Sequence, residues 1–193
     1  MLFRLPQGRG FAAARGPQQA GISARLKPKS AIIGAAGEHF VMAELLRRGH
    51  IAALAPQGAP NMDILIADEQ GQTLAAVQVK TRTQIGGDRG WHMGRKHQDI
   101  RGARLFYVFV DLGIPEGAAP EFFIVPADVV ADAVTDTHAA WLRNPGRNGH
   151  KRKDSDMRRI QPDYAAFYTD EPVNSQYATG WLEKYRSAWT LFD

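Results

Sequence analysis

The chain has 193 residues, 44% of them hydrophobic, which is enough to bury one core of ordinary domain size. It contains no cysteine, so disulfide bonds, cysteine-ligated zinc and a cysteine nucleophile are excluded. No apolar run approaches the roughly 20 residues of a membrane-spanning helix, and we expect a cytoplasmic protein that does not contact membranes.

The net charge of +4 is unevenly distributed. Residues 1–30 carry six basic residues and no acidic one, so the rest of the chain sums to −2. This first segment is also rich in Gly, Ala, Gln and Pro, which is typical of a basic, flexible N-terminal arm. A leader, or a start site assigned too far upstream, would have the same composition, so the three interpretations stay open. Residues 31–193 are expected to form a single domain.

Residues 31–48 are predicted to be an α-helix, which Ser30 can cap and Gly49 can end. Glu38 lies three, four and seven residues before apolar positions of this helix, so its carboxylate is on or beside the apolar face. A carboxylate there is costly unless it is paired or binds a metal. Placement to suit the helix dipole is the plainer alternative. The apolar positions are Phe40, Val41, Met42, Leu45 and Leu46.

Residues 61–80 are predicted to form a β-hairpin, because two aliphatic runs flank a polar turn centred between residues 70 and 71. In that register Asp63 faces Gln78, and Lys80 follows on the same face of its strand, about 7 Å further along. A slip of one residue would move Gln78 and Lys80 to the other face relative to Asp63.

Each of these three side chains has a plainer explanation. Asp63 can be a residue at a strand start, Gln78 a polar residue on a solvated face, and Lys80 an edge charge that discourages aggregation. Together they favour a site, because Gln78 and Lys80 share one face of a strand whose other residues are mostly aliphatic.

Basic residues are concentrated in two segments of the expected domain. Residues 80–104 and 143–159 each contain seven basic residues against two acidic ones. Such an excess is typical of a surface that binds phosphates, although a solvated loop is the plainer alternative for residues 151–153. Trp91 can stack on a base or cover the sheet edge. The candidates for nucleic-acid contacts are Arg82, Trp91, Arg95, Lys96, His97, Lys151, Arg152 and Lys153.

The remaining pattern favours an α/β fold. Residues 105–110 form a nearly continuous apolar run, as expected of a central strand covered on both faces, and residues 121–125 form a further strand. Short helices are predicted from Pro126 to Val134 and over 137–142. Residues 144–162 are predicted to be a loop, and 175–190 a last helix whose aromatic stripe packs on the core or, less simply, stacks on bases or forms a dimer face.

Four pieces of sequence resemble the PD-(D/E)XK nuclease superfamily, also called the restriction-endonuclease-like fold. They are Gly37-Glu38, the Leu-Leu-Arg-Arg-Gly helix end, Pro60-Asn-Met-Asp63 and Gln78-Val-Lys80. The chain is similar to small bacterial endonucleases of unassigned role and to Gln-X-Lys variants in type IV methyl-directed restriction catalytic domains. Archaeal Holliday junction resolvases share the helix Glu. The resemblance covers roughly residues 31–111.

The resemblance implies a fold and an extent. We expect a restriction-endonuclease-like α/β core with a mixed central β-sheet flanked by helices, over about residues 31–134. Extra C-terminal helices would form an extension over about residues 135–193.

The resemblance also implies a role for each site residue. Asp63 would be the principal metal ligand, and Glu38 a further ligand or a partner acting through water. Gln78 stands where most members have an acidic ligand and would assist with its carbonyl oxygen, while the backbone carbonyl of Val79 completes the site. Lys80 would orient the attacking water. The implied metal is Mg²⁺, with Mn²⁺ as a substitute, because Mg²⁺ takes oxygen ligands and keeps several waters.

The implied function is that of a metal-dependent endodeoxyribonuclease, which hydrolyses DNA phosphodiester bonds with metal-activated water. The alternative is a relative of the same fold that binds DNA or a protein without catalysis, after losing an acidic ligand. DNA is the expected partner. A homodimer is expected by analogy, because cutting both strands needs two sites.

Overall fold

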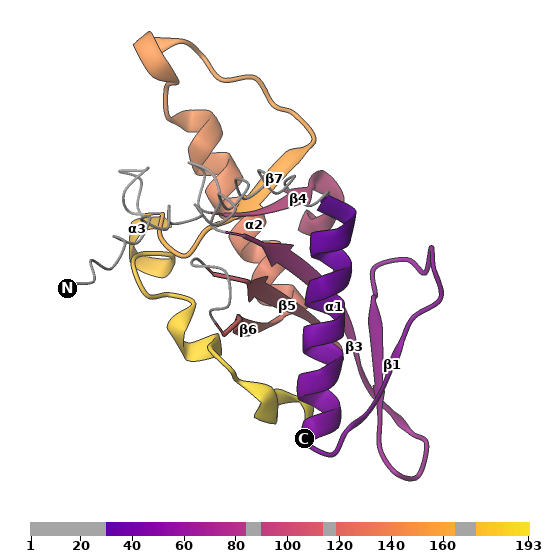
Figure 1. The fold of residues 1–193 in the computed structure, drawn as a ribbon. Coiled ribbons are helices and arrows are strands. Elements are labelled where there is room, and N and C mark those ends of the chain that lie inside the picture. The colour runs from indigo at the N-terminus through magenta and orange to yellow at the C-terminus, as the bar shows by residue number, and fades with distance from the viewer. Residues whose placement is uncertain (1–29, 84–89, 114–118, 165–172) are drawn as a thin grey trace, which may run out of the picture.

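The computed structural model describes residues 30–83, 90–113, 119–164 and 173–193 (Figure 1). The predicted arm lies outside these ranges except for its last residue. Among the described residues, no helix combines the length and hydrophobicity needed to span a bilayer. The helices and strands, with 3₁₀ turns written η, are α1 (Ser30–Arg47), β1 (Ile51–Leu54), β2 (Ile64–Ala67), β3 (Thr73–Arg82), β4 (Trp91–Gly94), η1 (Arg95–Gln98), β5 (Leu105–Asp111), β6 (Glu121–Pro126), α2 (Ala127–Arg143), η2 (Arg147–Gly149), β7 (Met157–Ile160), α3 (Val173–Gln176), η3 (Glu183–Tyr185) and η4 (Trp189–Phe192).

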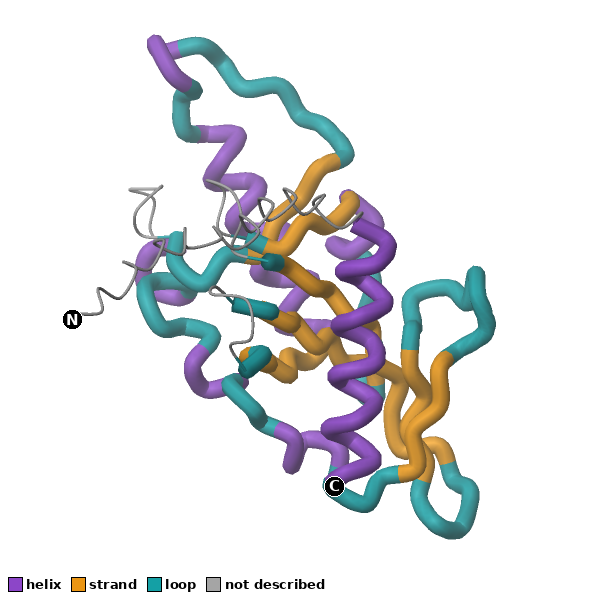
Figure 2. The backbone as a smooth tube through the Cα atoms, in the orientation of Figure 1, coloured by secondary structure: helices purple, strands orange, loops and turns teal. Residues whose placement is uncertain are grey.

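A five-stranded sheet with the order β1-β2-β3-β5-β6 forms the centre of the fold. β3 and β5 are parallel, and the other neighbouring pairs are antiparallel. α1 lies in front of this sheet and α2 behind it, as Figures 1 and 2 show. The predicted α/β fold with a mixed central sheet flanked by helices is confirmed.

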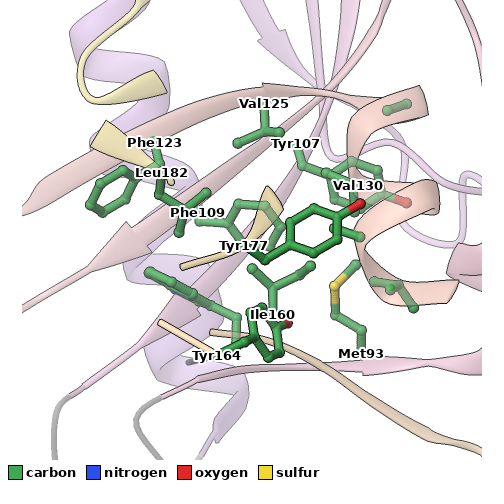
Figure 3. Close-up of a cluster of buried hydrophobic side chains, with 14 of the residues drawn as sticks. Met93, Tyr107, Phe109, Phe123, Val125, Val130, Ile160, Tyr164, Tyr177 and Leu182 are labelled. Carbon is green, nitrogen blue, oxygen red and sulfur yellow. The ribbon is translucent and has the colours of Figure 1, made fainter. Parts of the chain in front are cut away.

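The central strand β5 supplies both hydrophobic cores, because its side chains alternate between the two faces. Val108 and Val110 join Val41 and Leu45 of α1 in one buried cluster. Tyr107 and Phe109 point the other way, into a second cluster that includes α2 and the C-terminal segment (Figure 3). The continuous apolar run predicted for this strand is therefore explained by its burial on both faces.

A second, two-stranded sheet pairs β4 with β7 in antiparallel register. Neither strand was predicted, and the expected loop over 144–162 contains β7. Both strands have only four residues, and the β7 sequence Met157-Arg158-Arg159-Ile160 lacks a simple polar and apolar alternation. Their pairing depends on a contact between segments far apart in the chain, which local pattern does not reveal.

Two helix predictions were also wrong. α2 is one continuous helix, within which the hydroxyls of Thr135 and Thr137 donate to the carbonyls of Ala131 and Ala133, at 2.7 Å and 2.6 Å. The predicted helix over 175–190 is instead a series of short pieces, with Gly180 at a φ of +84°.

The aromatic residues of the C-terminal segment are consequently not on one stripe. Trp189 packs in the core beneath α1, whereas Trp181 and Tyr185 pack against the core beneath α2. Their common role is core packing at the two faces of the sheet, and Trp189 is 5% exposed. The alternatives of base stacking and a dimer face therefore lose their support.

α1 ends as predicted at Gly49, whose φ is +91°, but its buried stripe is narrower than expected. The buried residues are Gly37, Val41 and Leu45, spaced by four, while Phe40 and Leu46 are exposed. The stripe is narrow because only one line of the helix touches the sheet.

Gly37 is the point of closest approach between α1 and β3. A Cβ atom there would lie 1.8 Å from the Oγ1 of Thr81. Among the described residues, this hydroxyl is buried without a hydrogen-bond partner. The close packing of the helix on the strand therefore requires glycine at this position. The same packing sets the distance between the neighbouring Glu38 and the sheet.

We expect Gly37→Ala to lower the free energy of unfolding by about 1–3 kcal/mol, because the added methyl group forces α1 away from β3. Urea denaturation followed by circular dichroism measures this change. Gly34→Ala is the matched control on the same helix, since nothing lies within 4 Å of its Cβ position. It should stabilise the protein by up to about 1 kcal/mol through helix propensity alone.

Removing the contacting hydroxyl should restore part of the stability. Thr81→Ala in the Gly37→Ala background deletes the atom that the new methyl group would meet. Equal effects of the alanine substitutions at Gly37 and Gly34 would contradict the proposed close approach.

Candidate active site

Asp63 lies directly before β2, where the β2–β3 hairpin begins to separate. Its backbone N–H donates to the Val77 carbonyl at 2.7 Å, and its carbonyl accepts the Ala55 N–H at 2.8 Å. Ile64 is the register partner of Val77. The predicted register, with Asp63 facing Gln78, is therefore confirmed.

The turn of this hairpin differs from the prediction. Ile66 pairs with Ala75 but Ala67 pairs with Thr73, so Leu74 is an additional residue on the β3 side. Because of this bulge the turn is centred on residue 70 rather than between residues 70 and 71. The site is unaffected because the irregularity lies at the far end of the hairpin.

The Asp63 carboxylate is held at the edge of β3. Its Oδ2 accepts the Val79 backbone N–H at 2.7 Å and the Nε2 of the Gln78 amide. Among the described residues, no donor reaches Oδ1. One oxygen therefore positions the carboxylate, and the other is available for a ligand.

The Val79 carbonyl points to the same edge. The Ala76 N–H donates to the Arg104 carbonyl, on the β5 side of β3. On the other side, the Val77 carbonyl accepts the Asp63 N–H, and the Val79 N–H donates to the Asp63 carboxylate. Because the N–H and C=O of one strand residue point to the same side, the Val79 carbonyl lies on the edge that β2 leaves open. An oxygen donor thus lies beside the Asp63 carboxylate.

Glu38 belongs to the same electrostatic environment. Burial raises the pKa of its carboxyl, and the negative charge of Asp63 raises that pKa further, while His39 and Lys80 act in the opposite direction. Two carboxylates that repel each other favour a cation between them. Glu38 is therefore close enough to Asp63 for the two charges to interact, and its role as a metal ligand stays a prediction.

Lys80 and Gln78 share the face of β3 opposite to Val77 and Val79, as predicted from the strand period. Burial lowers the pKa of the Lys80 ammonium, and the charge of Lys96 lowers it further. Asp63 and Glu38 oppose this shift. A half-buried lysine therefore lies within the field of the two carboxylates.

Tyr107 and His97 form a buried pair behind the site. Their Oη and Nδ1 atoms are 2.7 Å apart, and the two residues are 0% and 3% exposed. Burial raises the pKa of the Tyr107 hydroxyl, and Asp63 raises it further. Tyr107 is the register partner of Gln78 across β3 and β5. The sequence analysis missed it because a tyrosine in an apolar strand has the pattern of ordinary core.

Burial, with the charges of Lys80 and Lys96, lowers the pKa of His97 to about 4 from 6.5. Below pH 6.5 the unfolded chain binds a proton at His97 that the folded chain does not, so we expect the fold to lose up to about 3 kcal/mol as pH falls from about 6.5 to about 4. His97→Asn keeps a hydrogen-bonding group for Tyr107 and should flatten this dependence.

Urea denaturation across this pH range measures the effect, and His39→Asn is the control because His39 is exposed on α1. A wild-type stability that does not fall between pH 6.5 and pH 4 relative to His97→Asn would contradict the buried neutral imidazole.

Lys96 is exposed beside the site. Its Nζ donates to the Asn61 side chain at 3.3 Å, two residues before Asp63. Its charge lowers the pKa of both Lys80 and His97. Lys96 is thus a second cation at the site mouth, placed by the turn η1.

Several residues expected to contact nucleic acid have other roles. Trp91 is 1% exposed and donates its indole N–H to the Val110 carbonyl at 2.9 Å. Arg82 covers the Trp91 ring at 3.8 Å and pairs with Asp111 at 2.7 Å. We therefore withdraw Trp91, Arg82 and the buried His97 from the proposed binding surface.

The other candidates remain at the surface. Lys151 and Lys153 are exposed, and Arg95 pairs with the exposed Asp154 at 2.7 Å. Arg152 is partly buried, with its guanidinium 4.8 Å from the centre of the Trp141 ring. Arg95 begins η1, and residues 151–153 lie in the segment before β7.

The donor set fits a hard cation such as Mg²⁺. Within the described residues, no three His, Asp or Glu side chains gather as a metal cluster. The Asp63 carboxylate and the Val79 carbonyl lie at the β3 edge, and the Glu38 carboxyl is within the field of Asp63. The Gln78 amide would supply an oxygen only after turning over. Mg²⁺ usually needs only one or two carboxylates, with water and substrate phosphate completing its shell.

No family model matches the chain, and no curated protein matches it. Two similar solved structures are the bacterial homing endonuclease I-Ssp6803I and the Holliday junction resolvase Hjc of Archaeoglobus fulgidus. The first has 15% identity and a TM-score of 0.47, covering 84% of this chain and 90% of that chain. The second has 16% identity and a TM-score of 0.37, covering 66% and 83%. At these values the likeness carries no functional conclusion.

Proposed function

We propose that the protein is a metal-dependent endodeoxyribonuclease with a PD-(D/E)XK-type site. The observation that carries this proposal is the Asp63 carboxylate, which the Val79 N–H and the Gln78 amide hold at an open strand edge. Lys80 follows Gln78 by two residues on the same strand. Glu38 of α1 is close enough for the Asp63 charge to raise its pKa. This arrangement combines oxygen donors for a cation with a lysine beside them.

Asp63 would hold the metal through Oδ1, together with the Val79 carbonyl. Glu38 would bind directly or through water, and the Gln78 amide would turn its oxygen inward. When bound, Mg²⁺ or Mn²⁺ would polarise the phosphate and supply an activated water. The raised pKa of Glu38 fits this role, because a cation would relieve its repulsion from Asp63.

Lys80 would stabilise the charge that develops on the phosphate and orient the attacking water. Its partial burial makes each of these contacts stronger than in water. Lys96, at the mouth of the site, would attract the phosphate backbone of the substrate. DNA is the proposed substrate, and a homodimer is proposed for cutting both strands.

The test is cleavage of supercoiled plasmid and of labelled structured DNAs in Mg²⁺, in Mn²⁺ and in chelator. Nicking that requires the metal is the expected result. Absence of cleavage on every substrate, with metal present and DNA binding retained, would exclude the nuclease function.

A second candidate is a binding protein that has lost catalysis. The observation that favours it is the Gln78 amide, which presents a nitrogen donor to Asp63 where most members of the superfamily have an acidic ligand. In that case the site would bind DNA without holding a metal.

Metal binding by the wild type separates these two functions. If the site holds a metal, the wild type should melt at a higher temperature in Mg²⁺ than in chelator, and Gln78→Glu should enlarge this difference, since the added charge strengthens metal binding. In chelator we expect Gln78→Glu to melt at a lower temperature than the wild type, because two carboxylates replace a carboxylate and its donor. Thermal unfolding in both buffers measures the shifts, and Gln57→Glu in an exposed loop is the control. A wild type that melts at the same temperature in both buffers would favour the binding protein.

A further inference from the structure

A cavity of about 260 Å³ lies between the second half of α2 and β7, and none of the residues of the candidate active site lines it. Pockets for drug-sized ligands are typically about 300–1,000 Å³. This cavity therefore suits one small group, such as a single nucleotide. Figure 1 shows β7 beside β4, well apart from β1.

The cavity is positively charged. Arg152, Arg158 and Arg159 line it, and no acidic side chain is among its described lining residues. Arg158 is 4% exposed, and its guanidinium is fixed by the Gln98 side chain at 3.0 Å and by the Ser155 carbonyl at 2.6 Å. A buried, immobilised cation of this kind favours an anion nearby.

One carboxylate compensates this charge only in part. Asp154 is 3.3 Å from Arg158, but it also pairs with Arg95 at 2.7 Å and with the His138 ring at 2.8 Å. Arg152 is outside this group and covers the Trp141 ring instead. Its guanidinium is therefore placed to meet a ligand that enters the cavity.

Aromatic side chains form the rest of the wall. Trp141 carries the Arg152 guanidinium 4.8 Å from its ring centre. Tyr164 is buried, and its hydroxyl both donates to the Arg159 carbonyl at 2.8 Å and accepts the Gln161 N–H at 3.0 Å, which makes this wall rigid. An arginine stacked on an aromatic ring suits a planar base and its phosphate.

The turn η1 connects this cavity to the candidate active site. Its last residue, Gln98, bonds to Arg158 in the cavity wall. Two residues earlier, Lys96 bonds to Asn61 beside the hairpin. A polyanion lying along η1 would meet the active site at one end and the cavity at the other.

We infer that this cavity binds one nucleotide unit, a base with its phosphate, of the same nucleic-acid strand that the active site would cleave. The base would stack on the Arg152 guanidinium, because Arg152 and the His138 ring already pack against Trp141. The phosphate would lie in the field of Arg158. The strand assignment rests on the proposed nuclease function, whereas the nucleotide chemistry rests on the cavity alone.

Binding without catalysis tests the inference. Fluorescence anisotropy of labelled single-stranded and duplex oligonucleotides in chelator would compare the wild type with Arg152→Gln and Lys184→Gln. Lys184 is the control, because it is an exposed cation that lies outside the cavity and outside the proposed binding surface. We expect at least about tenfold weaker binding for Arg152→Gln, as for loss of a stacked nucleotide, and less than about threefold for Lys184→Gln.

Competition identifies the ligand chemistry and its source. Free dAMP should displace the labelled oligonucleotide from the wild type better than inorganic phosphate does, and Arg152→Gln should abolish this difference. Equal losses for the two variants, or dAMP no better than phosphate, would overturn the inference, since both mean general attraction to charge. Unchanged melting temperatures would establish that both variants are folded.

The cleavage assay separates this inference from the proposed function. If the protein cuts DNA but Arg152→Gln cuts and binds like the wild type, the cavity inference alone is wrong. If the protein cuts nothing but dAMP binding depends on Arg152, the nuclease function fails and the cavity is a site for free nucleotide.

Discussion

Asp63→Asn is expected to lower metal-dependent DNA cleavage by at least about 100-fold without unfolding the protein. A bound metal supplies several kcal/mol of transition-state stabilisation, and each 1.36 kcal/mol is a factor of ten in rate. The substitution removes the charge that would hold the metal. It retains the hydrogen bonds, because an asparagine oxygen in the place of Oδ2 can accept both the Val79 N–H and the Gln78 amide N–H.

Initial rates of plasmid nicking in Mg²⁺ and a thermal unfolding curve check this expectation together. Asp99→Asn is the control, since Asp99 is exposed and is not part of the hairpin site. Cleavage by Asp63→Asn within about threefold of the wild type, which is less than 1 kcal/mol, would remove Asp63 from the metal site.

Lys80→Met should lower cleavage by about 100- to 1,000-fold, which is the usual effect of removing one group that stabilises transition-state charge. Methionine matches the length of the lysine stem and fills the same half-buried space. Metal binding should persist, because the oxygen donors remain. Lys80→Arg should also fail, since a planar guanidinium does not replace a compact ammonium in a confined site.

The pH dependence of the rate assigns the role of Lys80. Burial and Lys96 lower its pKa, so it loses its proton at a lower pH than an ordinary lysine does. If the charged form is the active one, the cleavage rate falls as pH rises through that lowered pKa. If the wild-type cleavage rate instead rises through that pKa, and the rate of Lys80→Met does not, Lys80 acts as a general base.

The position of Glu38 depends on the packing of α1 against β3 at Gly37. Glu38 reaches the environment of Asp63 only because Gly37 lets α1 lie directly against Thr81. Stability and activity are therefore coupled at this position. A substitution that lifts the helix would also move the Glu38 carboxylate away from the proposed metal site.

The sequence by itself determined the parts of the structure that have a strong local pattern. The helix over α1, the hairpin with Asp63 opposite Gln78, and the strands β5 and β6 all follow from periodicity, turn residues and continuous apolar runs. Alternation along β3 also determined that Gln78 and Lys80 share a face. These features depend on residues close together in the chain, so the sequence contains the information for them.

Only the tertiary structure decided which polar and aromatic residues face the solvent. Trp91 and His97 looked like ligands of nucleic acid, but the pairing of β4 with β7 and the contact with Tyr107 bury them. The same pairing creates the cavity around Arg158. Burial depends on contacts between segments distant in sequence, and for this reason local patterns predicted the hairpin and the Asp63–Gln78 contact but not the surface around them.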